Sequence, residues 1–134
     1  MRVLLDSNVW LSVITARRGF CRRLWREIAK QCEVFSGRPV VREVEEKLEK
    51  KFRYSPKRAH RLAAYVEKRT TPVPLSAQPP PMCRDPDNDL ILALAVKSGC
   101  AYLITGDRDL LVLGKVGKLA IVTPREFAAM IGIE

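Results

Sequence analysis

Short apolar runs alternate with helical segments along most of this chain, and this alternation limits its fold more than any other feature. The runs are rich in strand-forming residues and show no strict alternation of polar and apolar positions, which is typical of strands covered by helices on both faces. Strands that alternate with helices build a mainly parallel sheet, so we predict an α/β fold. The predicted strands cover residues 2–5, 33–35, 71–75, 102–104 and 118–122, and the predicted helices cover residues 8–14, 20–30, 40–52, 56–66, 86–98, 109–113 and 124–130. Residues 76–84 contain three consecutive prolines and are predicted to form a stiff, extended crossover.

The chain has 134 residues and is expected to form one domain over residues 1–134. No apolar run approaches the ~18–20 residues of a membrane span. The N-terminal stretch lacks a signal-peptide cleavage site, so we expect a cytoplasmic protein with no membrane contact. The four cysteines have no metal-ligand spacing and there is a single histidine. This composition argues against a zinc site and against His-based nucleophilic catalysis, so any hydrolysis must depend on carboxylates.

The net charge of +9 is distributed unevenly along the chain. Residues 16–69 hold 17 Lys and Arg against 7 Glu, whereas all six Asp lie outside that segment. Basic surfaces attract phosphate backbones, so nucleic acid is the favoured partner class. The alternative is a basic surface that serves only solubility. The predicted RNA contacts lie on the polar side of the second helix and are Arg22, Arg23 and Arg26.

Three aspartates are predicted to meet at one edge of the sheet. Asp6 follows the first strand, Asp107 follows the fourth, and Asp89 lies in the first turn of the helix after the crossover. In a parallel sheet the carboxyl ends of the strands and the following helix starts share one edge. Clustered carboxylates repel one another unless a cation neutralises them, and hard oxygen ligands select Mg²⁺ or Mn²⁺. Helix capping is the competing explanation for Asp85 and for Asp107.

In these motifs the chain resembles the PIN-domain nucleases, and within them the VapC-type toxins of toxin–antitoxin pairs. The resemblance rests on four stretches, which are residues 3–8, 43–48, 83–95 and 102–110. It implies a three-layer α/β/α PIN-like fold around a central, mainly parallel sheet. It also implies a metal-dependent endoribonuclease that uses one or two Mg²⁺ or Mn²⁺ ions and is silenced by a cognate antitoxin protein.

Carried over residue by residue, the resemblance implies a set of catalytic and metal-binding acids and a set of supporting residues. The catalytic and metal-binding acids would be Asp6, Glu43, Asp89 and Asp107. The auxiliary residues would be Asp85, Asp109, Asn8, Thr105 and Glu46. Helical periodicity alone cannot choose between Glu43 and Glu45, because both lie about 100° from the middle of the apolar stripe of their helix.

Two expectations about geometry follow. The carboxyl groups of Asp6, Asp89 and Asp107 should lie within roughly 4–8 Å of one another, the span that one or two hydrated cations bridge. At least one acid of the cluster should have a raised pKa, because like charges in one pocket disfavour full ionisation.

Other functions and assemblies stay open at this stage. A non-catalytic RNA-binding or assembly module on the same fold is the main alternative. A phospho-acceptor receiver domain is disfavoured, because no Asp follows the middle strand and no Lys follows the last. The apolar sides of residues 20–28 and 62–66 are candidate surfaces for a homodimer.

Overall fold

The computed structural model describes residues 1–16, 18–75 and 79–133, and these residues form a layered α/β structure around one six-stranded sheet. The strand order is β3-β2-β1-β4-β6-β5, and every neighbouring pair is parallel except β5 and β6. In chain order the elements are β1 (Arg2–Leu5), α1 (Ser7–Thr15), α2 (Phe20–Gln31), β2 (Glu33–Ser36), α3 (Arg38–Lys50), α4 (Pro56–Lys68), β3 (Thr71–Pro72), α5 (Pro86–Lys97), β4 (Tyr102–Ile104), α6 (Arg108–Leu111), β5 (Lys115–Val116), β6 (Leu119–Val122) and α7 (Pro124–Met130). The predicted α/β class with a mainly parallel sheet is therefore confirmed.

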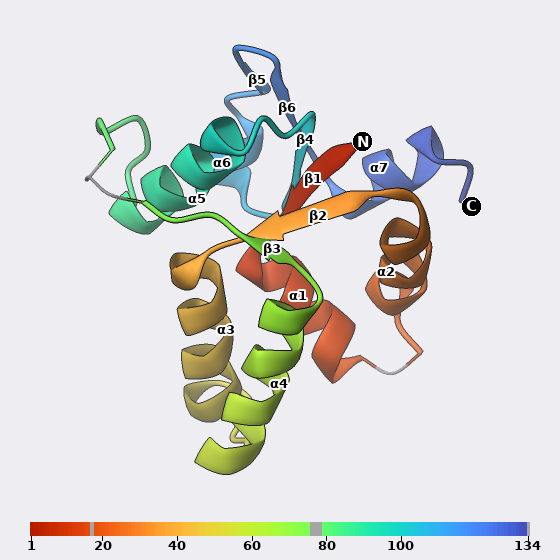
Figure 1. The fold of residues 1–134 in the computed structure, drawn as a ribbon, viewed down its shortest axis with the longest axis vertical. Coiled ribbons are helices and arrows are strands. Elements are labelled where there is room, and N and C mark those ends of the chain that lie inside the picture. Colours follow the sequence, from red (N-terminus) through yellow and green to blue (C-terminus); the bar gives the residue numbers. More distant parts are fainter. Residues whose placement is uncertain (17, 76–78, 134) are drawn as a thin grey trace.

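Helices cover both faces of the sheet (Figure 1), with α1, α3 and α4 below the strands in that view and α5 and α6 above them. This placement explains why three consecutive residues of the central strand β1, Val3, Leu4 and Leu5, are all at most 1% exposed. Both faces of β1 lose water, so its sequence is continuously apolar. On one side Trp10 of α1 contacts Trp25 of α2 edge to face, with ring centroids 4.6 Å apart.

The edges of the sheet differ from the prediction. β3 pairs only with β2 and covers two residues instead of the predicted five. Pro72 and Pro74 lack an N–H to donate, which limits strand pairing. On the opposite edge the unpredicted strand β5 forms a two-residue hairpin loop with β6, beginning at Gly117 with a φ of +60°. Strands of two residues are too short to show a periodic pattern.

The two apolar faces considered for a homodimer are mostly covered within the chain itself. Leu24, Trp25 and Ile28 of α2 are at most 6% exposed, and Ala63 and Val66 of α4 at most 1%. The crossover is described only from residue 79, so residues 76–78 of that prediction lie outside the described residues. No helix in the described part of the chain is long and apolar enough to cross a membrane.

Candidate active site

A polar pocket of about 300 Å³ lies at the carboxyl end of β1, where the first turns of α1, α5 and α6 meet the side of α3. Parallel strands bring these helix starts to one edge of the sheet, as the sequence predicted for Asp6 and Asp107. The residues that line it are Asp6, Ser7, Asn8, Glu43, Glu46, Lys47, Asp85, Asp87, Asn88 and Asp107. Six of them are carboxylates and one is a lysine.

Asp6 is the most buried carboxylate of the pocket, at 3% exposed. It directly follows β1 and caps α1, with Oδ1 accepting from the Ser7 backbone N–H at 2.7 Å. Its Oδ2 accepts from the Thr105 hydroxyl at 2.7 Å. Burial raises the pKa of Asp6, and the negative charges of Glu43 and Asp107 raise it further, against the lowering effect of its hydrogen bonds. The predicted raised pKa is thus present, with loss of solvation as its first cause.

Thr105 connects the two acids that follow β1 and β4. Its hydroxyl donates to Asp6 and accepts from the Asp107 backbone N–H at 3.0 Å. The side chain of Asp107 then caps α6 by accepting from the Asp109 N–H at 2.9 Å. Asn8 accepts from the Gly106 N–H at 3.4 Å. These contacts hold the ends of two neighbouring strands in a fixed relation.

The structure places the glutamates of α3 in different surroundings. Val40, Val44 and Leu48 are fully buried, which turns Glu43 and Glu46 toward the pocket. Glu43 Oε1 accepts from the Ser7 hydroxyl at 2.7 Å and lies 3.0 Å from Lys47 Nζ.

Glu45 lies elsewhere on the helix. Its carboxylate is 3.1 Å from His60 Nδ1 on α4, so it faces the neighbouring helix. Helical periodicity leaves Glu43 and Glu45 equivalent, and it is the packing of α3 against α4 that distinguishes them.

Asp89 does not line the pocket, contrary to the expectation from sequence. Its Oδ1 accepts from the backbone N–H groups of Met82 and Cys83 at 2.9 and 2.8 Å. The Met82 amide is the main cause that holds the pKa of Asp89 below its usual value, with the Cys83 amide and thiol acting in the same direction. Asp89 therefore fastens the end of the crossover to α5.

The neighbouring Asn88 occupies the pocket position that Asp89 was expected to fill. Asn88 is 6% exposed, and its side-chain amide donates to Asp107 Oδ2 at 3.2 Å. Sequence reasoning missed this residue because an uncharged amide beside three aspartates gives no signal of its own. Burial of the first turn of α5 was the feature that could have pointed to Asn88 as a pocket residue.

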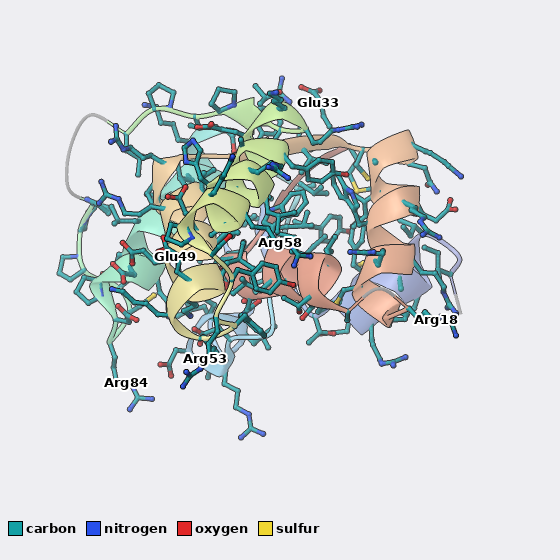
Figure 2. All side chains as sticks on the ribbon, turned by 90° about the horizontal axis from the view of Figure 1, so that it is seen from below. Arg18, Glu33, Glu49, Arg53, Arg58 and Arg84 are labelled. Carbon is teal, nitrogen blue, oxygen red and sulfur yellow. The ribbon has the colours of Figure 1, made fainter. Side chains whose placement is uncertain are left out.

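The auxiliary acids occupy two different places. Asp85 caps α5 by accepting from the Asp87 N–H at 2.9 Å, and both residues line the pocket. Asp109 lies outside the lining and pairs with Arg84 at 2.8 Å. The Arg84 side chain projects from the edge of the molecule in Figure 2.

The three arginines of α2 also differ. Arg22 donates to the carbonyl oxygens of Val13 and Ile14 at 2.8 and 3.0 Å, so its guanidinium closes the end of α1. Arg23 lies over the ring of Phe20. Arg26 is exposed.

The donors of the pocket fit a hard divalent cation. They are carboxylate, amide and hydroxyl oxygens, the ligand types that Mg²⁺ and Mn²⁺ prefer. Among the described residues, however, no three acid, His or Cys side chains lie close enough together to hold an ion as they stand. Glu43 Oε1, one of these donors, is held by the Ser7 hydroxyl and by Lys47 Nζ.

Comparison with known proteins gives a consistent family and fold. A protein-family profile described as PIN domain matches residues 2–109. Among solved structures, the chain is similar to VapBC2 from Rickettsia felis bound to a promoter DNA fragment, with a TM-score of 0.67, 12% identity, and coverage of 92% of this chain and 98% of that one. It is also similar to VapBC-1 from nontypeable Haemophilus influenzae, with a TM-score of 0.64, 11% identity, and coverage of 93% and 99%.

A third similar structure is VapC20 from Mycobacterium tuberculosis, a sarcin–ricin loop cleaving toxin. Its TM-score is 0.60 at 20% identity, with coverage of 85% of this chain and 96% of that one. At these identities the likeness to the solved structures shows a shared fold. No curated protein matches the sequence.

Proposed function

The chain belongs to the PIN-domain family, and from this premise we propose that it is a Mg²⁺- or Mn²⁺-dependent endoribonuclease that acts as the toxin of a toxin–antitoxin pair. The observation that carries the proposal is the pocket at the carboxyl end of β1. It gathers six carboxylates from four separate stretches of sequence and places them beside one lysine. A protein that only binds RNA gains nothing from concentrating negative charge next to a phosphate backbone.

Asp6, Glu43 and Asp107 are the residues we propose to hold the metal. Glu46, Asp85 and Asp87 line the same pocket and are available as further ligands, directly or through water. When bound, a divalent ion supplies Lewis acidity toward water and toward the scissile phosphate.

The neighbouring polar residues have a positioning role in this proposal. Thr105 orients Asp6 and Asp107 together, and Asn88 holds one oxygen of Asp107. Ser7 orients Glu43. The role of Asp89 in the pocket is indirect, because it fixes the main chain that leads into Asp85 and α5.

RNA is the substrate we propose, because the chain combines a strongly basic segment, residues 16–69, with an acidic pocket. Arg23 and Arg26 stay among the proposed RNA contacts of α2. Arg22 is engaged with α1, so the proposal depends less on Arg22 than on the exposed Arg26. Figure 2 shows Arg53 and Arg84 projecting outward on the same side of the molecule. Both side chains are exposed; Arg53 is suited to phosphate contacts, whereas Arg84 already pairs with Asp109.

An antitoxin protein is the second partner we propose. The similar structures from Rickettsia felis and Haemophilus influenzae are VapBC complexes, and they cover nearly the whole of this chain. Co-expression with the protein encoded by the neighbouring gene, followed by co-purification, tests this part of the proposal.

The nuclease proposal is tested with purified protein, labelled RNA and either added Mn²⁺ or EDTA. We expect cleavage that requires the metal and falls by about 10²-fold or more in Asp6→Asn and Glu43→Gln, since each loses a negative ligand that stabilises the transition state. Glu45→Gln is the matched control, because it removes an equal charge from the same helix outside this pocket. RNA binding without cleavage in any metal would contradict the nuclease and support the non-catalytic RNA-binding module.

A further inference from the structure

Lys47 is the only cation among the described residues that line the acidic pocket. Its Nζ lies 3.0 Å from Glu43 Oε1, one helical turn earlier on α3. The same oxygen accepts from the Ser7 hydroxyl at 2.7 Å, so two donors hold it at once. The lysine thus binds one of the oxygens that a metal ion would need.

The surroundings of this ion pair distinguish it from an ordinary pair on a helix surface. Exposed pairs spaced four residues apart on a helix contribute little to stability. Here the partner Glu43 has a side chain only 25% exposed, and five further carboxylates line the same pocket. The ammonium therefore lies beside a group of carboxylates that repel one another.

We propose that Lys47 is the internal counter-ion of the metal-free pocket and that a divalent cation binds by displacing its ammonium from Glu43. This inference rests on the proposed function, because it concerns the same metal site. The displacement is sterically simple. The Lys47 side chain is 46% exposed and has a flexible four-carbon stem, so the ammonium can turn into solvent while α3 stays in place.

The exchange explains why the acids do not converge. In the described residues no three acidic side chains are close enough to hold an ion. Glu43 Oε1 is held by Ser7 and Lys47, and this oxygen becomes available to a cation when that ammonium leaves. Lys47 is then a positioning residue that sets the metal affinity of the site.

The size of the effect follows from Coulomb's law. A unit positive charge about 5 Å from a divalent ion, in a water-like dielectric, weakens binding of that ion by roughly tenfold. Salt screening reduces this figure, so the measurement belongs at low ionic strength.

The experiment is a calorimetric titration of Mn²⁺ into metal-free wild type, Lys47→Met, Lys47→Arg and Lys50→Met. Lys50 lies on the same helix, is exposed and does not line the pocket, so its substitution is the matched charge control. We expect Lys47→Met to bind Mn²⁺ about tenfold more tightly than wild type. Lys47→Arg and Lys50→Met should stay within about twofold, because the charge near Glu43 is kept.

A second measurement needs no metal. In EDTA at pH 7, Lys47→Met should unfold at a lower temperature than Lys50→Met, because its pocket carboxylates have lost their counter-ion. Equal unfolding temperatures would overturn the counter-ion role. Lys47→Gln repeats both measurements with a polar side chain, so the outcome does not depend on the apolar methionine.

The outcomes separate this inference from the proposed function. If wild type binds Mn²⁺ and Lys47→Met binds it no more tightly, the exchange is wrong and the metal site stands. If none of the folded proteins binds Mn²⁺, the metal dependence of the proposed function fails and the exchange fails with it.

Discussion

At the scale of single residues, Asp6 combines burial with charge. A carboxylate that is 3% exposed and flanked by Glu43 and Asp107 has a pKa raised above 3.8. The folded chain therefore holds this proton more tightly than the unfolded chain does. The stability of the metal-free protein falls as pH rises from the unfolded pKa through the raised folded one, and the loss is complete above it.

Replacing Asp6 by Asn should therefore raise the Tm of the metal-free protein at pH 7. The amide oxygen keeps the cap on Ser7 and the charge is gone. We expect a gain of several degrees, since about 1 kcal/mol shifts the Tm of a chain of this size by roughly 4 °C. The difference in Tm should shrink as the pH is lowered toward 4, and an increment that does not change with pH would contradict the electrostatic cause.

Asp89 gives a second prediction at this scale, because the structure gives it a different role from Asp6. Both backbone N–H groups donate to its Oδ1, and Asn supplies an oxygen at the same place. Asp89→Asn should then keep cleavage within about tenfold of wild type, whereas a metal ligand would lose about 10²-fold or more. Asp89→Ala leaves both amides without this acceptor and should lower stability by about 1–2 kcal/mol. If Asp89→Asn lost as much cleavage activity as Asp6→Asn, this prediction would be contradicted and Asp89 would again be proposed as a metal ligand.

At the scale of elements, the contact between α1 and α2 uses an arginine that sequence assigned to RNA. Arg22 donates to two carbonyl oxygens at the end of α1, where a positive charge is also favoured by the helix dipole. Its neighbour Arg26, one turn later, is exposed.

Substitutions of Arg22 and of Arg26 should have different effects on stability and on RNA binding. Arg22→Ala should cost about 1–2 kcal/mol in denaturant unfolding, because it removes a charge-assisted cap. Arg26→Ala should change stability by no more than about 0.5 kcal/mol. If Arg26 contacts a phosphate, its loss should flatten the slope of log K for RNA against log salt by about 0.7. An equal stability loss in both variants would contradict the cap.

At the scale of the whole molecule, we propose that the basic segment binds the RNA backbone and that the acidic pocket holds the metal. Residues 16–69 carry a net charge of +10 and the remaining residues a net charge of −1, and the acidic pocket collects aspartates from those remaining parts of the chain. We expect RNA binding in EDTA to weaken steeply with salt. Asp6→Asn and Asp107→Asn should bind RNA at least as tightly as wild type, because less negative charge faces the phosphates. Filter binding over a salt series measures this, and weaker RNA binding by both variants would show that the acids support the fold of the RNA site.

The order and type of the elements were predictable from the sequence because burial leaves a local periodic pattern. Continuous apolar runs predicted the central strands, and stripes at helical spacing predicted α2, α3 and α4. The meeting of Asp6 and Asp107 was also predictable, since strands that run parallel must end at the same edge. Two-residue edge strands such as β5 could not be found in this way, because they have no repeat to detect.

Which side chain of the first turn of α5 enters the pocket was decided only by the tertiary structure. Asn88 and Asp89 are neighbours in one helical turn, and the choice between them depends on where the amides of Met82 and Cys83 come to lie. The same holds for Glu43 and Glu45, which differ through the position of α4 and His60. Local sequence determines what a segment becomes because its pattern records its own burial. It does not record which distant donor will satisfy a given carboxylate, because that partner is set by the packing of the other elements.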